Sequence, residues 1–312
     1  IDLILEYREI AKLLSTYIDS IPAQVADDGR LHTRFLQIGA ATGRIASIDP
    51  NLQNIPIKTE LGRAIRNAFV AEDGFNFASF DYSQFELRIA AFLSGDEKLI
   101  GIFRDGLDVH SAVSSQVFKV PLDHVTADMR RKAKVINFGI LYGMGVTALR
   151  TNLGGTKEEA ETFLKEYFDT YPKLAEFIMK VKTITKELGY TTTLFGRRRY
   201  FPEIKSSLPF LRASAERMAV NAPIQGTQAD LLKVAMVRVD DYITKEKLED
   251  KVRLLLTVHD ELDFEIHESV SEKVVKEIKK IMEAVLTCEE SKGVPIVANG
   301  STGKNWGQLE KL

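Results

Sequence analysis

The sequence predicts an α+β fold, in which strands and helices occupy separate stretches of the chain. Residues 75–80 (FNFASF) form an apolar run of strand length that leads directly to an acidic residue. Residues 252–258 and 261–266 are two more strand-like runs, and the two residues between them fit a tight hairpin turn. The intervening residues 89–206 are rich in helical spacing. We therefore expect an antiparallel sheet built from both ends of the chain, with a helical region inserted between its parts.

Composition limits where a functional site can lie. The chain has 312 residues, a size at which single hydrophobic cores usually divide into domains. Its net charge of −2 gives no overall attraction to nucleic acid, so such a site has to be a local basic patch, as at 130–134 or 197–199. The only cysteine, Cys288, excludes an internal disulfide and a multi-cysteine zinc site. No apolar run is long enough for a membrane span, and no signal segment is visible.

The N-terminal part is predicted to begin with a helix and to continue through short extended segments. Apolar residues keep helical spacing up to a break at 21–22 (IP): Leu3, Tyr7, Ile10, Leu14 and Tyr17. A strand-like stretch at 31–38 precedes a turn of small residues at 40–44, and 49–56 (DPNLQNIP) has the residues of an ordered loop. Because the chain starts inside a helix and without a methionine, we expect it to be part of a longer protein.

The strand at 75–80 is predicted to place Asp81 at its end, with a helix starting directly after it. Ser83 and Glu86 have the spacing of a capping box, so helix capping alone could explain both. Asp260, in the turn of the predicted hairpin, also stands at a strand end, and neighbouring strands could bring it beside Asp81. Two aspartates plus a carbonyl would suffice for magnesium, which keeps several waters.

The segment 128–144 predicts a helix with two different faces. Four residues recur every four positions, drifting only about 40° per step around the axis: Arg130, Lys134, Phe138 and Tyr142. An apolar stripe lies roughly opposite: Met129, Ala133, Ile136 and Ile140. Cations suit phosphate oxygens and aromatic faces suit a base or sugar, so the first stripe predicts a nucleotide lying along the helix. A solvated basic face would explain Arg130 or Lys134 alone, but it does not explain all four together.

The C-terminal part predicts a helix at 211–222 before Pro223, then the hairpin, then an amphipathic helix at 270–286. His259 and Asp260 form the hairpin turn. In the second strand, acids alternate with apolar residues and lie on one side: Glu261, Asp263 and Glu265.

The segment 130–143 closely resembles the fingers helix of family A DNA polymerases, the DNA polymerase I type, with the signature Arg-x3-Lys-x3-Phe/Tyr-Gly-x2-Tyr-Gly. Every fixed place is filled: Arg130, Lys134, Phe138, Gly139, Tyr142 and Gly143. The segments 81–88 (DYSQFELR) and 259–261 (HDE) resemble the motifs that carry the family's two catalytic aspartates. The resemblance runs over essentially the whole chain. It implies a right-hand polymerase fold without its thumb, with palm at 1–88 and 207–312 and fingers at 89–206.

The resemblance also implies roles for single residues. Asp81, Asp260 and the carbonyl of Tyr82 would bind two Mg²⁺ ions, with Mn²⁺ as a substitute. Lys134 would be catalytic, and it belongs to the set expected to contact the nucleotide: Arg130, Lys134, Phe138, Tyr142, His110, Glu86 and Gln84. Glu86 would close the sugar pocket against Tyr142. A further set would contact DNA: Arg44, Gln53, Asn54, Arg217, Asn221, Gln225 and His259.

Some of these residues have simpler explanations when they are taken singly. Arg44 would more often be a surface arginine, and His110 a surface or capping histidine. Two departures from the family pattern occur: Phe85 replaces an aliphatic residue, and Asp263 replaces an apolar one.

The expected function is DNA-templated DNA polymerisation from dNTPs. The expected partners are primer–template DNA and an upstream part of the same protein, holding the thumb and with or without exonuclease domains, but no membrane. The expected location is the cytoplasm, at the bacterial nucleoid, with an organelle as the alternative. Two other functions stay open: a nucleic-acid-binding fragment with weak or no activity, and a two-metal nuclease, which would not need the stripe from Arg130 to Tyr142.

Overall fold

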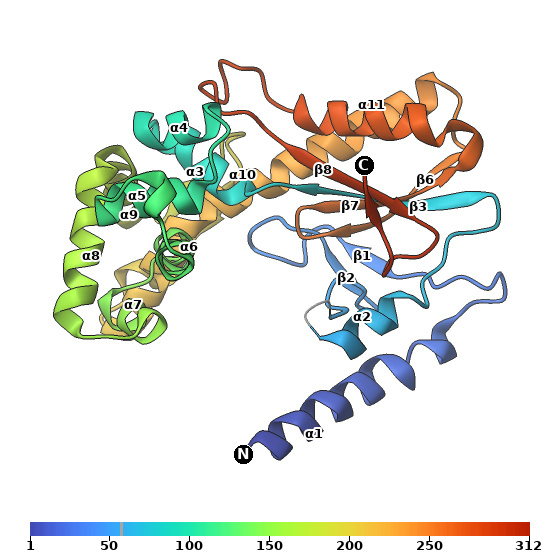
Figure 1. The fold of residues 1–312 in the computed structure, drawn as a ribbon, viewed down its shortest axis with the longest axis horizontal. Coiled ribbons are helices and arrows are strands. Elements are labelled where there is room, and N and C mark those ends of the chain that lie inside the picture. Colours follow the sequence, from blue (N-terminus) through green and yellow to red (C-terminus); the bar gives the residue numbers. More distant parts are fainter. Residues whose placement is uncertain (57–58) are drawn as a thin grey trace. The chain divides into compact units, whose positions relative to one another are not determined.

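The computed structural model describes residues 1–56 and 59–312, which divide into two compact units (Figure 1). The sheet unit comprises Ile1–Ser83, Leu232–Met282 and Ala298–Leu312. The helical unit comprises Gln84–Leu231 and Glu283–Val297. The α+β class is confirmed. The chain passes from the helical unit back to the sheet unit at 231, whereas the sequence-based boundary lies at 206.

The sheet unit contains a five-stranded antiparallel sheet with the order β6-β7-β3-β8-β9. Its strands are β3 (Phe75–Tyr82), β6 (Val252–Val258), β7 (Glu261–His267), β8 (Ala298–Gly303) and β9 (Glu310–Lys311). The strands expected at 75–80, 252–258 and 261–266 are present, and β6 and β7 form the expected hairpin. Because β3 lies between β7 and β8, the centre of the sheet pairs segments that are nearly 200 residues apart in sequence.

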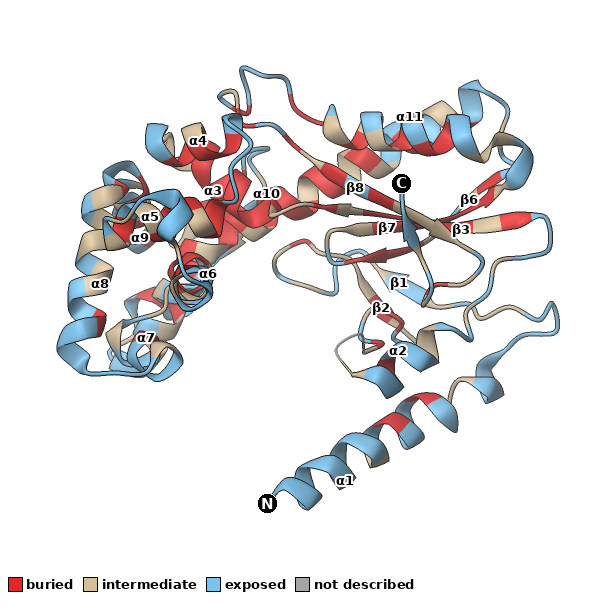
Figure 2. Ribbon diagram, in the orientation of Figure 1, coloured by how far each residue is buried: buried red, intermediate tan, exposed pale blue. Residues whose placement is uncertain are grey.

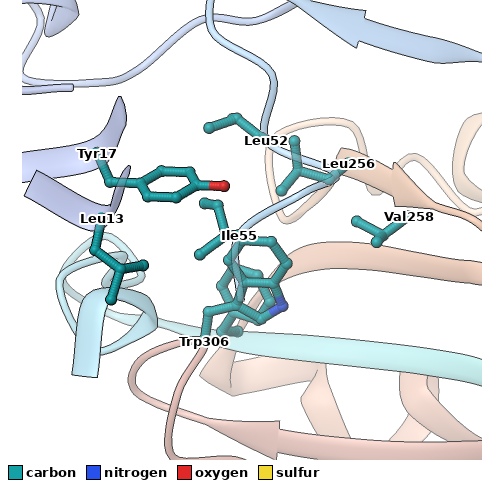
Figure 3. Close-up of a cluster of buried hydrophobic side chains, with 8 residues drawn as sticks. Leu13, Tyr17, Leu52, Ile55, Leu256, Val258 and Trp306 are labelled. Atoms are coloured by element: carbon teal, nitrogen blue, oxygen red, sulfur yellow. The ribbon is translucent and has the colours of Figure 1, made fainter. Parts of the chain in front are cut away.

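The alternation of side chains along β7 places different residues on the two faces of the sheet. Leu262, Phe264 and Ile266 are fully buried on one face. Helix α11 (Ser271–Glu283) packs against the sheet, and the Tyr82 hydroxyl of β3 donates to the Met282 carbonyl at 2.9 Å. The helix predicted at 270–286 is thus confirmed. A second cluster is shown in Figure 3: Leu13, Tyr17, Leu52, Ile55, Phe77, Leu256, Val258 and Trp306.

The N-terminal helix is present, but most of its predicted apolar stripe is exposed. Helix α1 (Asp2–Leu13) continues into a π-helical turn (Leu14–Ile18), and only Leu13 and Tyr17 are buried (Figure 2). The strand predicted at 31–38 is shorter, because only β1 (Arg34–Leu36) finds a partner, β2 (Ala46–Ile48). A 3-10 turn (Pro22–Gln24) and helix α2 (Glu60–Arg66) complete this part.

The helical unit confirms the helix-rich region expected between 89 and 206. Its elements are α3 (Phe85–Ser94), α4 (Glu97–Arg104), α5 (Val109–Phe118), α6 (Ala127–Leu141), α7 (Val146–Leu153), α8 (Lys157–Thr170), α9 (Pro172–Leu188), and a hairpin of β4 (Tyr190–Thr192) and β5 (Arg198–Tyr200), with 3-10 turns at Leu122–His124 and Pro202–Lys205. Several helices begin at side chains that accept a backbone N–H of the first turn: Asp96, Asp108, Thr126 and Thr156. None of the helices in the described ranges has the length and apolar character of a membrane span.

The expectation that a helix at 211–222 precedes Pro223 was incomplete. Helix α10 (Pro209–Lys245) runs through Pro223 without ending and has 37 residues. A proline inside a helix removes one hydrogen bond and costs about 3 kcal/mol. The residues on both sides, Ala222 and Ile224, are buried, and the packing of this segment keeps the helix continuous.

Candidate active site residues

The sheet unit brings three carboxylates together at the β6–β7 hairpin. Asp81 of β3 is in register with Glu261, the first residue of β7. The backbone N–H of Tyr82 donates to the Asp260 carbonyl at 3.2 Å. His259 adopts a left-handed backbone with φ of 57°, which lets the chain reverse within two residues. The strand ends therefore bring Asp81 and Asp260 close together, as expected, because β3 pairs directly with the second strand of the hairpin.

The closeness of these acids affects the protonation of Asp81. Burial raises the pKa of Asp81 to about 7, and the negative charges of Asp260 and Glu261 add to this effect. A bound cation would relieve the repulsion, and the available donors are oxygens, which magnesium prefers. Within 1–56 and 59–312 no group of three His, Cys, Asp or Glu side chains is arranged for a metal. The expected set of two carboxylates and the Tyr82 carbonyl, completed by water or phosphate oxygens, fits magnesium without a third acid.

Helix α6 has the two faces expected from its spacing. Ala133, Ile136 and Ile140 are buried, whereas Arg130 and Lys134 are exposed. Phe138 is half-buried on the exposed stripe. Tyr142 follows the last residue of the helix and is 44% exposed, so both aromatic rings of the stripe are accessible from solvent.

Arg130 is held by an acid that the sequence did not assign to the site. Its Nε and one terminal nitrogen donate to the two carboxylate oxygens of Asp108, at 3.0 and 2.9 Å. Asp108 also accepts the backbone N–H of Ser111 and caps α5. Burial alone would raise the pKa of Asp108, but the hydrogen bonds from Arg130 and Ser111 outweigh burial and lower it to about 2. These two hydrogen bonds, called the Arg130–Asp108 fork below, use only some of the five N–H donors of the guanidinium.

His110 of α5 lies beside the same helix. The His110 Nδ1 atom is 3.2 Å from the Asn137 amide nitrogen, and the ring lies 5.8 Å from the Phe138 ring. Burial lowers the pKa of His110; Asp108 opposes this shift, and Arg130 and Lys134 add to it. The imidazole is therefore neutral at pH 7. The expected nucleotide residues Arg130, Lys134, His110 and Phe138 thus come together where α5 packs on α6.

Glu86 does not form the capping box that its spacing allowed. The N-cap residue of α3 is Gln84 and not Ser83; it has φ of 52° and makes no side-chain cap hydrogen bond. Instead the Tyr142 hydroxyl donates to one carboxylate oxygen of Glu86 at 2.9 Å, and the Gln225 amide approaches the other at 3.4 Å. The contact expected between Glu86 and Tyr142 is present.

Helix α10 places the expected template residues next to this pair. Arg217, Asn221 and Gln225 are four residues apart and share one helical face. Gly143 has φ of 66° and lies against Arg217, where a Cβ atom would be only 2.9 Å from the arginine Cγ. The glycine of the signature is therefore needed for the close approach of the end of α6 to α10.

The other expected DNA contacts lie in the sheet unit and differ in accessibility. Asn54 and His259 are exposed, and Arg44 is half-buried. The Gln53 amide nitrogen donates to the carbonyls of Ile45 and Thr257 at 2.9 and 2.8 Å, and its oxygen accepts the Ser47 N–H. Both hydrogens of the amide nitrogen are used in these bonds, so a DNA contact through that nitrogen would require one of them to break, whereas the oxygen can accept a second hydrogen bond. The role of Gln53 in DNA binding stays a prediction.

Sequence reasoning missed three residues beside the site. The sequence indicates a role for Asp108 only weakly: this residue precedes a helix and stands two residues before His110. Nothing in the sequence pointed to Asn137, because it occupies a place that the signature leaves unspecified. Asp263 stands out in the sequence only as a departure from the family pattern; it is fully buried opposite Ser79, and its carboxyl group interacts with the side chains of Ser79 and Glu261.

These features are those expected of a polymerase palm and fingers: carboxylates meeting at a sheet hairpin, and a helix presenting cations and aromatics beside a Glu–Tyr pair. The model of DNA polymerase family A matches residues 1–308, and the chain belongs to this family.

The chain is 46% identical over 304 residues to DNA polymerase I of Pseudomonas aeruginosa, covering 97% of this chain and 33% of that protein. It is also 46% identical over 308 residues to the thermostable DNA polymerase I of Thermus aquaticus, covering 98% and 36%. The solved POL domain of Pol1 from M. smegmatis, in complex with DNA primer-template and dNTP, superposes with a TM-score of 0.92 at 42% identity, covering 98% of this chain and 53% of that one. The chain spans about a third of the length of these curated relatives.

Proposed function

We propose that this chain carries out DNA-templated DNA synthesis. A primer 3′-hydroxyl would attack the α-phosphate of a dNTP, forming the new P–O bond while the bond to the β-phosphate breaks and pyrophosphate leaves. The single observation that carries this proposal is the pairing of Asp81 with Glu261 beside Asp260, in a chain that also has the complete α6 stripe. The solved relative with bound primer–template and dNTP supports the same substrates.

Asp81, Asp260 and the Tyr82 carbonyl would hold two Mg²⁺ ions, for which Mn²⁺ could substitute. When bound, such ions lower the charge repulsion at the attacking and leaving oxygens. The raised pKa of Asp81 supports this assignment, because a cation would replace the proton that Asp81 otherwise tends to keep.

The helical unit would bind the nucleotide. Arg130 and Lys134 would neutralise the triphosphate and the departing pyrophosphate, and His110 would donate to a phosphate oxygen. Phe138 would pack against the sugar, and the Glu86–Tyr142 pair would leave no room for a 2′-hydroxyl. Gln84 would contact the nucleotide from the start of α3.

The DNA would be bound by residues of both units: Arg44, Gln53, Asn54, His259, Arg217, Asn221 and Gln225. Because the relatives are about three times longer, we also propose that a part outside these 312 residues contributes to holding the duplex.

Primer extension with Mg²⁺ and four dNTPs tests the proposed function, with the chain alone and with the upstream part supplied. Asp81→Ala and Asp260→Ala should each abolish extension while the Tm shows a folded protein, because each removes a proposed metal ligand and not a core contact. Asp73→Ala, an exposed acid of the same unit, is the matched control and should extend normally. Substantial extension by either site variant would refute the assignment, and primer shortening without dNTPs would identify a nuclease instead.

A further inference from the structure

We propose that Asn137 is a positioning residue that fixes His110 as the neutral tautomer with its proton on Nε2. The proposal rests on the proposed function, in which His110 contacts the phosphates of the nucleotide. Asn137 lies on α6, at a place that the signature leaves unspecified, and His110 lies on α5.

The hydrogen-bond chemistry of the pair determines the tautomer. The Asn137 amide nitrogen carries two hydrogens and no available lone pair, so at 3.2 Å from His110 Nδ1 it can only donate. The Nδ1 atom must then be the acceptor and carry no proton. A neutral imidazole has one proton, which is therefore on Nε2.

Burial makes this contact decisive. Asn137 is 1% exposed and His110 is 5% exposed, so water cannot easily replace either partner. The Phe138 ring, 5.8 Å away and tilted by 48°, limits rotation of the imidazole from another side. The ring is held both by the amide and by its aromatic neighbour.

The second atom of the amide indicates that Asn137 serves more than packing. Its Oδ1 is buried and has no hydrogen-bond partner among the described residues. An unpartnered buried oxygen is unfavourable, and a leucine of similar size would avoid it. The hydrogen bond to His110 is the compensating contact that a leucine could not make.

The charges around His110 favour the neutral ring. Arg130 and Lys134 disfavour a second proton on the imidazole, while Asp108 favours it and is itself engaged by Arg130. An Nε2–H group can donate to a phosphate oxygen without first gaining or losing a proton. The opposite tautomer would present a lone pair to the phosphate and repel it.

Long-range ¹H–¹⁵N spectra of the histidine rings test the proposal directly, with the chain as it is and without nucleotide. There are five histidines, and His110 is assigned by the signal lost in His110→Gln. We expect an unprotonated Nδ1 and a protonated Nε2. Asn137→Asp, whose carboxylate accepts a hydrogen bond, should move a proton to Nδ1. A wild-type ring protonated on Nδ1, or a ring unchanged in Asn137→Asp, would overturn the proposal.

Kinetics separate a positioning role from a structural one. Asn137→Leu should raise the KM for dNTP by about two- to ten-fold with little change in kcat, which corresponds to one neutral hydrogen bond. In the His110→Gln background the same substitution should have no further effect on KM, whereas a purely structural role predicts additive losses. If the tautomer is as expected but His110→Gln leaves KM unchanged, the proposed contact of His110 with phosphate fails and the positioning by Asn137 stands.

Discussion

Among single residues, the buried carboxyl group of Asp263 is the main departure from the family pattern. Its side chain is fully buried, and burial raises its pKa well above the usual value, with Glu261 adding to the shift. The Arg66 guanidinium favours the charged form of Asp263, but it is half-buried over the Trp306 ring, with its centre 4.1 Å from the ring centroid, and burial lowers its own pKa. We infer that Asp263 lowers the free energy of unfolding relative to an apolar residue, because a buried apolar side chain needs no hydrogen bond or opposite charge to offset its burial.

The pH dependence of stability tests this inference. The pKa of Asp263 is higher in the folded than in the unfolded protein, so the folded state holds this proton more tightly. The resulting contribution to the free energy of unfolding is fully present below about pH 4. That contribution is lost as the pH rises through the folded pKa. Asp263→Val should therefore raise the free energy of unfolding at pH 8 by about 1–3 kcal/mol and flatten its decline with pH. Urea unfolding between pH 5 and 8 measures this, with Asp73→Val as the exposed control. A variant less stable than wild type at pH 8 would contradict it.

Asp108 combines two roles that substitutions can separate. Asparagine can still cap α5 but loses the ionic fork with Arg130, whereas alanine loses both. Asp108→Ala should lower the free energy of unfolding by about 0.5–2 kcal/mol, and Asp108→Asn by less than about 1 kcal/mol, because the ion pair is largely exposed.

The pKa of about 2 gives this prediction a pH signature. A lowered pKa means that the contribution of the fork is present above about pH 4 and is lost as the pH falls through about 2. The difference in Tm between wild type and Asp108→Asn should therefore shrink below pH 4. Equal Tm values for Asp108→Ala and Asp108→Asn at pH 7 would show that the cap contributes nothing.

At the element scale, the exposed stripe of α6 presents a sequence of chemistries along one helix. Arg130 and Lys134 come first along the stripe, and Phe138 follows. Tyr142 comes last, and its hydroxyl is hydrogen-bonded to Glu86. A phenylalanine at position 138 has no hydroxyl with which to replace the 3′-OH that a dideoxynucleotide lacks. Selection of the sugar is therefore expected to be divided between Phe138 and the Glu86–Tyr142 pair.

Phe138→Tyr should raise the use of dideoxynucleotides while leaving dNTP incorporation nearly unchanged. One hydrogen bond near a charged group contributes about 1.5–3 kcal/mol, so the dideoxy/deoxy ratio should rise about ten- to a hundred-fold. Competitive incorporation measures the ratio, and Phe195→Tyr, an exposed residue of the same unit, is the control. An unchanged ratio would remove α6 from the sugar pocket. Glu86→Ala should separately increase ribonucleotide incorporation.

At the scale of the whole molecule, net charge gives little help in holding DNA. The chain carries a net charge of −2, and the expected DNA contacts include only two arginines, Arg44 and Arg217. Affinity for a duplex depends on the number of phosphates neutralised and on the counterions released. Binding by these residues alone is therefore expected to be weak.

Titration of primer–template binding against salt measures the number of phosphate contacts. With about two contacts, the slope of log K against log salt should be close to −2. Supplying the upstream part should steepen the slope and tighten binding, because it adds cationic contacts. The single-nucleotide extension rate on saturating DNA should not change. If the slope of log K against log salt is equally steep without the upstream part, the chain alone makes all the phosphate contacts to the duplex.

Local sequence patterns were enough to predict most of the helices and strands and the two faces of α6, but not the exposure of the apolar stripe of α1. Apolar runs predicted β3 and β6, the alternation of acids with apolar residues predicted β7, and the four-residue recurrence predicted the stripe on α6, because such patterns depend only on neighbouring residues. A two-residue gap sufficed to predict the hairpin turn that holds Asp260. Family resemblance then indicated which residues should act on a nucleotide.

Only the tertiary structure decided which partner each polar group takes. Glu86 had two possible partners, and the packing of α6 and α10 near α3 selected Tyr142 over a capping box. Asp108 and Asn137 gained their roles from the contact of α5 with α6. Pro223 stayed inside a helix because its neighbours are buried. In each case the deciding energy comes from groups distant in sequence, since hydrogen bonding and burial depend on what packs nearby and not on local spacing.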